Sequence, residues 1–353
     1  MRAVHLLGVG ATSFSSAGRS AQELAREAIE AALADAGLAP GDIDAVTVAT
    51  GGDDQDTAGL DVLGNGSRRR RFPPVCVSGA TALHVGWQAV ATGAIDVVLC
   101  VGHEAARPGA RTEALEPLAA AASQYMESSG ATEEHFARVA ANSRAHGADN
   151  PRASLTTSVD AAAIMASDVL VWPLRRLMVA APSEGAAAVV LACSDASRRR
   201  GARAPRVRAS VLVRDGDHDV AGAIGRAARL GYEAAGLGPD EIDCAEIDDR
   251  TASGELAAYE ALQFAPEGQG PELVDSGFTA RGGVLPVNTS GGALARGDAS
   301  GAAGIAQLCE LAWQLRGQAE RRQVAGARVG LALAGARDER DGALVALTIL
   351  SAA

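Results

Sequence analysis

The sequence predicts an α/β fold built from two halves of similar design. Residues 28–48 read AIEAALADAGLAPGDIDAVTV, and residues 227–247 read AARLGYEAAGLGPDEIDCAEI. In both segments an amphipathic helix ends at an AGL sequence, a turn containing proline follows, and a strand begins after Ile-Asp. Because the two segments share their order of elements as well as their letters, they indicate a duplicated unit.

The other expected elements also recur in the same order in both halves. The corresponding pairs are strands 3–9 and 207–213, helices 80–92 and 301–315, strands 95–101 and 329–334, and strands 186–192 and 343–350. Apolar runs of this length between helices are typical of buried strands in a mixed sheet. We therefore assign residues 1–200 to an N-terminal half and residues 207–353 to a C-terminal half.

An insertion is expected inside the first half, at about residues 105–169. It is rich in Ala, Ser, Glu and Asn, with helical patches at 115–129 and 133–146. Because this length exceeds that of an ordinary connection, we interpret it as a loop domain or lid. The basic, Pro- and Gly-containing stretch 198–206 is interpreted as the link between the halves.

Composition excludes several classes of function. The net charge of −11 argues against a nucleic-acid partner, and the absence of lysine excludes Schiff-base and P-loop chemistry. No apolar run reaches the length of a membrane span, and no spacing of Cys and His suits a metal. Five widely spaced cysteines and no signal-like N-terminus predict a reducing, cytoplasmic setting.

Cys76 is the candidate nucleophile. It follows Pro73 and Pro74 and precedes Ser78 and Gly79 at an expected strand-to-helix turn. A helix N-terminus favours a thiolate, because unpaired N–H groups and the helix dipole stabilise negative charge there. A buried structural cysteine is the alternative, and it is the interpretation we adopt for the other four thiols. Those are Cys100, Cys193, Cys244 and Cys309.

Four segments, in order along almost the whole chain, resemble the thiolase superfamily, most of all its sterol-carrier and lipid-transfer-protein type. CVSGATALHVGWQAVATGAIDVVLCVGHE resembles the CxSG nucleophile segment and the strand after it. YMESSGATEEHFARVAANSRAHGADNPRA resembles the loop domain of the lipid-transfer type. WPLRRLMVAAPSEGAAAVVLA is similar to DPLxxxxxxPxSDGAAA, and LPVNTSGGALARGDASGAAGIAQ to lPvNxSGGxxxxGHPxGAtG.

The resemblance implies a five-layered αβαβα thiolase fold, with the active site where the two halves meet. It implies acyl transfer from an acyl-CoA or acyl-carrier-protein thioester onto Cys76, without a tightly bound cofactor. It also implies a dimer, which we expect to form through strand 95–101, or a heteromer of the thiolase type. A role in lipid or secondary metabolism, related to that of ketosynthases, would follow.

Both motif histidines of the family are replaced in this chain. Asp248 stands at the histidine of HDxF, and Asp298 at that of GHP. A carboxylate accepts a proton from a thiol only if its pKa is raised, and donates one only when protonated. His103 is the remaining imidazole candidate for acid/base work, against the alternative of an ordinary loop histidine. Donors to the thioester oxygen are expected from four residues, Asn288, Ser290, Gly291 and Gly292.

Three functions remain open on the sequence. The first is an acyltransferase that uses Cys76 and passes the acyl group to a carbon, oxygen or nitrogen acceptor. The second is a retro-aldol lyase acting on a hydroxyacyl-CoA with a small OB-fold partner, as some lipid-transfer-type relatives do. The third is a non-catalytic thiolase-fold subunit of a heteromeric synthase, which loss of the acid/base positions would suit.

Overall fold

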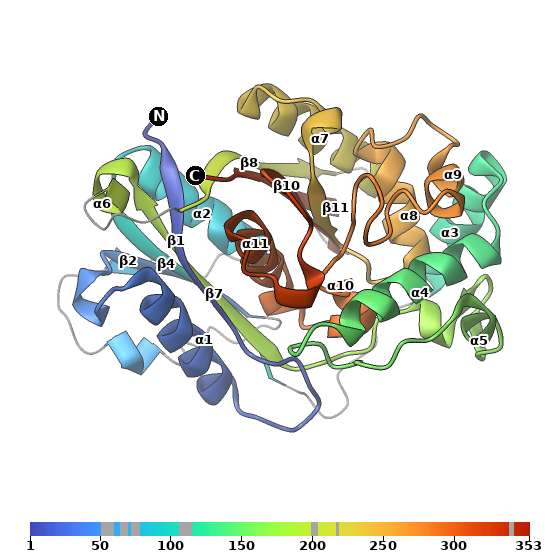
Figure 1. Cartoon of the computed structure of the whole chain (residues 1–353), viewed down its shortest axis with the longest axis horizontal. Coiled ribbons are helices and arrows are strands. Elements are labelled where there is room, and N and C mark those ends of the chain that lie inside the picture. The colour runs from blue at the N-terminus through green and yellow to red at the C-terminus, as the bar shows by residue number, and fades with distance from the viewer. Residues whose placement is uncertain are drawn as a thin grey trace.

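The structure is a computed structural model, and it describes residues 1–50, 60–63, 70–71, 78–105, 115–198, 204–216, 219–338 and 342–353. Strands from both halves join in one sheet, with helices between and outside them (Figure 1). Within the described residues the order of strands in this sheet is β3-β2-β4-β7-β1-β8-β11-β10-β9. The first half supplies β1 (Val4–Ala11), β2 (Ala45–Thr50), β3 (Arg70–Arg71), β4 (Val97–Glu104) and β7 (Gly185–Cys193). The second supplies β8 (Arg206–Asp215), β9 (Cys244–Ile247), β10 (Val329–Asp338) and β11 (Gly342–Ser351).

Strand pairing confirms the duplication. In the first half β2 runs parallel to β4, β4 is antiparallel to β7, and β7 is antiparallel to β1. In the second half β9, β10, β11 and β8 repeat the same directions in the same order. The halves meet where β1 pairs with β8, through Val4 opposite Val207 and His5 opposite Arg206. β1 therefore lies in the middle of the sheet.

The five αβαβα layers are also as predicted. Helix α1 (Ala21–Ala36) covers the outer face of the first half, and α7 (Val220–Ala235) covers that of the second. Between them, α2 (Gly79–Ala91) and α11 (Ser300–Arg316) contact strands of both halves. Figure 1 shows α11 near the centre of the molecule, with α1 and α7 on opposite sides of it. α11 is buried around most of its circumference, as a helix enclosed between the strands of the two halves must be.

The two repeated helices end as the sequence predicts, and each begins at a side-chain cap. Ser20 accepts a hydrogen bond from the backbone of Glu23 at the start of α1, and the Asp219 carboxylate does the same for Gly222 of α7. Gly37 and Gly236 follow the two helices with φ values of 62° and 67°. Only glycine adopts this left-handed conformation without steric cost, so both helices stop there.

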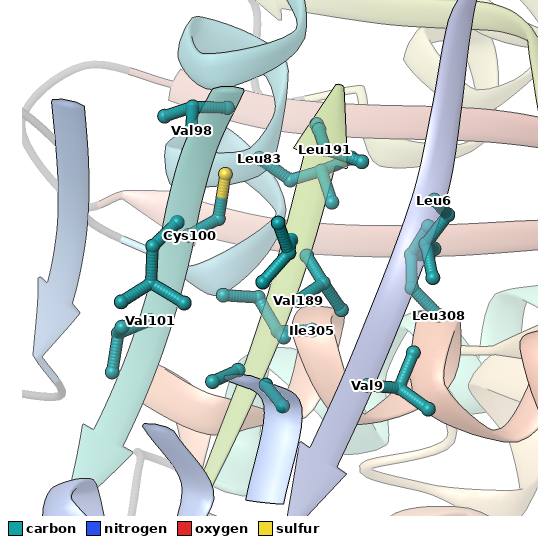
Figure 2. Packing of buried hydrophobic residues seen from close by; sticks show 14 of the residues in the cluster. Leu6, Val9, Leu83, Val98, Cys100, Val101, Val189, Leu191, Ile305 and Leu308 are labelled. Atoms are coloured by element: carbon teal, nitrogen blue, oxygen red, sulfur yellow. The ribbon is translucent and has the colours of Figure 1, made fainter. Parts of the chain in front are cut away.

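The core of the first half is a layer of aliphatic side chains between its strands and the central helices. Val9 of β1, Cys100 of β4 and Val189 of β7 lie opposite one another across the three strands, and they share one cluster with Ile305 and Leu308 of α11 (Figure 2). Four of the cysteines are buried free thiols, in agreement with their structural interpretation: Cys100, Cys193, Cys244 and Cys309.

The insertion packs on the second half, although it interrupts the first half in sequence. It contains α3 (Leu115–Ser129), α4 (Glu133–Ala148), α5 (Ala161–Met165), β5 (Val169–Val171) and β6 (Leu174–Arg175). α3 and α4 contact α8 (Ala252–Ala261), and α4 also contacts α9 (Gly270–Asp275) and α10 (Gly292–Arg296). Phe136 of α4 shares one hydrophobic cluster with Tyr259 of α8. A short helix, α6 (Ser194–Arg198), follows β7, and most of the expected link 198–206 lies outside the described residues.

One expectation about assembly is wrong. The sequence predicts that strand 95–101 forms a dimer edge, but β4 is hydrogen-bonded to β2 on one side and β7 on the other. A strand paired on both sides within its own chain offers no free backbone edge. The edge strands of the described sheet are β3 and β9. Among the described helices, none has the length and apolarity to cross a membrane.

The close approach of α2 and α11 predicts a stability difference between two glycine substitutions. A Cβ at Gly304 would lie 2.7 Å from the Cβ and backbone nitrogen of Ala80, whereas a Cβ at Gly225 of α7 would meet only Ala261 O at 3.7 Å. We expect Gly304→Val to lower the free energy of unfolding by about 2–3 kcal/mol through overpacking. Gly225→Ala should raise it by up to about 1 kcal/mol through helix propensity. Urea unfolding of both variants measures the difference, and equal stabilities would contradict this view of the interface.

Candidate active site

The N-termini of the two central helices lie against each other where the halves meet. A Cβ at Gly79, the first residue of α2, would lie 2.9 Å from the carbonyl oxygen of Gly301 in the first turn of α11. Ser78 caps α2 by accepting a hydrogen bond from Thr81 N at 3.3 Å. The positive ends of two helix dipoles therefore lie close together here, although Ala302 N and Ala303 N of α11 already donate to Ala299 O.

Glu104, at the end of β4, fixes the start of α11. Its Oε2 accepts hydrogen bonds from Ser300 Oγ at 3.0 Å and from Gly301 N at 3.2 Å. The backbones are in contact here too, because a Cβ at Gly102 would lie 2.2 Å from Gly301 O. Sequence reasoning did not single out Glu104, although the GHE sequence at the end of the strand placed it beside the expected site.

Cys76 lies outside the described residues. The element expected to follow it is present, because α2 begins at Gly79 with Ser78 as its N-cap. The nucleophilic role of Cys76 stays a prediction.

Asp298 lies just before α11 and is held by its backbone. Its N–H donates to Ala181 O at 2.9 Å, and its carbonyl oxygen accepts from Ser183 N at 2.8 Å. The half-buried Asp298 is thus fixed two residues ahead of Ser300, which Glu104 binds.

His103 is placed differently from an ordinary loop histidine. It lies inside β4, opposite Thr50 of β2 and Ala186 of β7, and is 2% exposed. β2 ends at Thr50, opposite His103, and only β7 continues the pairing to Glu104, through Gly185. The buried position leaves the imidazole little direct access to solvent, and its acid/base role stays a prediction.

Asp248 follows β9 and faces a groove. Its Oδ1 accepts from Arg250 N at 3.3 Å and lies 3.5 Å from Arg250 Nε, and its side chain is 24% exposed. The groove has a volume of about 660 Å³ and lies between α3, α7, α8 and the end of β10. Neither Asp298 nor His103 is among its lining residues, so of these three candidates only Asp248 reaches it.

The loop 288–292, expected to donate to a thioester, is instead bonded within the chain. Asn288 Oδ1 accepts from Ile247 N at 2.8 Å, and its Nδ2 donates to Glu255 Oε2 at 3.0 Å. Ser290 donates to Glu246 through its N–H at 2.9 Å and its Oγ at 2.5 Å. Asn288, Ser290, Gly291 and Gly292 are all buried. These contacts give the loop a structural role, and donation to a substrate stays a prediction.

Two further residues hold the same loop. Asp249 accepts from Ala293 N at 2.5 Å and Leu294 N at 3.1 Å, so it caps α10, which follows the loop directly. His146 of α4 lies 2.9 Å from Asn288 O through Nδ1 and accepts from Arg281 N at 3.1 Å through Nε2. An Nε2 acceptor requires the neutral Nδ1–H form, and burial lowers the pKa of His146 accordingly.

Carboxyl groups with raised pKa values concentrate beneath this loop. Burial, then the charge of Glu310, raises the pKa of Glu246 to about 7, and burial raises the pKa of Glu255 to about 7. Burial followed by the charge of Glu255 raises the pKa of Asp249. Arg296, 4% exposed at the end of α10, opposes this shift at Glu246 and Asp249. No group of metal-binding residues occurs among the described residues.

Glu246 should therefore make stability depend on pH. A carboxyl group whose folded pKa is near 7 and whose unfolded pKa is near 4.5 contributes stability below pH 4.5 that is lost as the pH rises through 7. That shift in pKa corresponds to a change of about 3 kcal/mol at most in the free energy of unfolding. We expect Glu246→Gln to flatten the decline in urea midpoint between pH 5 and pH 8, because glutamine does not ionise. The exposed Glu116→Gln is the control, and parallel pH profiles for wild type and Glu246→Gln would contradict the assignment.

Comparison with known proteins agrees with the two-half fold. Residues 7–107 match the family model "Thiolase, N-terminal domain", and residues 207–337 match "Thiolase C-terminal domain-like". Sterol carrier protein 2 of Homo sapiens is 32% identical over 94% of this chain and 69% of its own length. Acetyl-CoA acetyltransferase of Methanothermobacter thermautotrophicus is 32% identical over 94% of this chain and 95% of its own.

A solved structure extends the likeness to three dimensions. The "Ltp2-ChsH2(DUF35) aldolase" superimposes with a TM-score of 0.88 at 27% identity, covering 99% of this chain and 98% of that one. The family models match both halves in order, and the sequence and structural likenesses each cover nearly all of the chain. On these grounds the chain belongs to the thiolase family.

Proposed function

We propose that this protein is an acyltransferase that accepts an acyl group from a CoA or carrier-protein thioester on Cys76. The observation that carries the proposal is the meeting of the N-termini of α2 and α11, with Ser78 capping α2 two residues after Cys76. The positive ends of the two helix dipoles favour a thiolate near them, and also the oxyanion formed when that thiolate attacks a carbonyl. Family membership supports the same chemistry, because acetyl-CoA acetyltransferase is among the relatives.

The proposed reaction has two steps. The Cys76 thiolate attacks the thioester carbonyl, a new C–S bond forms, and the CoA or carrier thiolate leaves and takes up a proton. An acceptor nucleophile then attacks the acyl-enzyme and releases Cys76. We assign proton transfer to Asp248 and Asp298, with His103 as the remaining imidazole. An oxygen or nitrogen acceptor needs no enolate, so it suits carboxylates at the histidine positions better than a Claisen-type carbon acceptor does.

A retro-aldol lyase is the second candidate. It is favoured by the 27% identity to an aldolase over almost the whole chain, together with the aspartates at both histidine positions. Here a base removes the β-hydroxyl proton of a hydroxyacyl-CoA, the Cα–Cβ bond breaks, and the enolate of the shortened thioester takes up a proton. The name of that aldolase includes DUF35, so we propose a small partner chain of the OB-fold type for this alternative.

Acyl transfer predicts a covalent adduct. Wild-type protein incubated with isotope-labelled acetyl-CoA should carry the label on the peptide that contains Cys76, as measured by mass spectrometry. Cys76→Ala should lose the adduct and about 10³-fold or more of the transferase rate. Cys193→Ala is the matched control, because Cys193 is a buried thiol of β7. A label that remains in Cys76→Ala would contradict the proposal.

Lyase chemistry differs from acyl transfer in its dependence on Cys76. Cleavage of a hydroxyacyl-CoA, followed by release of the carbonyl product, should persist in Cys76→Ala and fall in Asp248→Asn. If neither acyl transfer nor cleavage is found with wild type, and the protein co-purifies with an intact thiolase or ketosynthase, the non-catalytic subunit is the remaining interpretation.

A further inference from the structure

Small side chains on two helices leave space in the groove beside Asp248, although α3 also lines it with the larger Leu118, Gln124 and Tyr125. The helix α3 contributes Ala121 and Ala122, and α8 contributes Gly254, Ala257 and Ala258. Ala122 and Ala258 are buried and bring the two helices together at the base. Ala121 is exposed and Ala257 is half-buried, so these two residues lie on the parts of the walls nearer the solvent.

The opposite wall and the floor of the groove are apolar. Ile224, in the second turn of α7, is 7% exposed, and Leu333 of β10 is 1% exposed. Leu118 of α3 adds a third aliphatic side chain. Apolar surface of this kind, open to a groove of about 660 Å³, favours a hydrocarbon occupant over a polar one.

The charged residues of the groove oppose an anionic occupant. They are Asp219, Asp248 and Arg250, two carboxylates against one guanidinium. The phosphate groups of CoA would meet a net negative lining there. Asp248 and Arg250 follow β9 and form a charged end, whereas α3 and α8 contribute the apolar positions together with uncharged polar side chains such as Ser253.

We propose that this groove holds the acyl chain of the thioester, with the reacting carbonyl at the Asp248–Arg250 end, and that Ala121 and Ala257 determine the chain length accepted. This inference rests on the proposed thioester chemistry. A ten-carbon chain occupies roughly 300 Å³ if each methylene takes the volume of a water molecule, about 30 Å³. The groove therefore admits chains of this length or branched chains of similar bulk.

The test compares acyl-CoA binding by variants whose groove is narrowed by a larger side chain with binding by a protein whose groove is unchanged. Ala257→Leu on α8 and Ala121→Leu on α3 each add three carbons to a different wall of the groove. Ala120→Leu is the matched control, because Ala120 is an exposed residue of α3 that does not line the groove. Dissociation constants for decanoyl-CoA and acetyl-CoA are measured calorimetrically, with all variants made in the Cys76→Ala protein. Because these proteins lack the proposed nucleophile, the dissociation constants are measured without acyl transfer.

Each filling variant should weaken decanoyl-CoA binding about tenfold or more, because each buried methylene contributes about fourfold in affinity. Acetyl-CoA binding should change less than about twofold, and Ala120→Leu should leave both unchanged. Equal losses for both thioesters would place the pantetheine arm in the groove and overturn the inference. So would unchanged decanoyl-CoA binding in both filling variants. A protein that binds decanoyl-CoA in this pattern but forms no Cys76 adduct would retain the groove assignment and lose the acyltransferase proposal.

Discussion

Helices α2 and α11 pack with their backbones in contact, and the arrangement of both halves follows from that contact. Gly79 and Gly304 have room for a hydrogen atom but not for a side chain, so the helix axes approach more closely than ordinary side chains permit. Because each helix also packs on strands of both halves, their separation sets the distance between the two sheet regions. The same contact aligns the first turns of the two helices. Looser packing of α2 against α11 would therefore disturb both the arrangement of the halves and the candidate active site.

A second constraint lies beneath the loop 288–292, where hydrogen bonds to buried carboxylates replace hydrophobic packing. Glu246, Asp249 and Glu255 each accept bonds from the loop or from the helix after it. Burying carboxyl groups is costly unless they are bonded or neutralised, and here the raised pKa values of Glu246 and Glu255 reflect that cost. The benefit is a loop whose backbone is fixed by directional bonds from several elements, which apolar packing does not provide.

The sequence is informative where local chemistry determines the outcome. The glycines after α1 and α7, the buried strands and the repeated order of elements can all be inferred from residue patterns, because helix stops and strand burial are local properties. The candidate active site is harder to predict from the sequence. Asn288 and Ser290 have the composition of a substrate-binding loop, yet their partners Glu255 and Glu246 come from α8 and β9, so only the tertiary structure reveals that their polar atoms are occupied.

The pattern around His103 does not show where its strand ends, because that depends on β2 and β7, which both extend alongside it. The expectation that strand 95–101 is an edge fails for the same reason.

The position of β1 has a consequence for how the chain folds. It precedes the other described strands in sequence, yet it lies in the middle of the sheet, and its partners β7 and β8 begin at Gly185 and Arg206. Pairing across such a separation must overcome a large loss of chain entropy before any stabilising contact is gained. We therefore expect the apolar residues of β1 to stay unpaired in the nascent chain until β7 and then β8 have been made, and to need protection during that time.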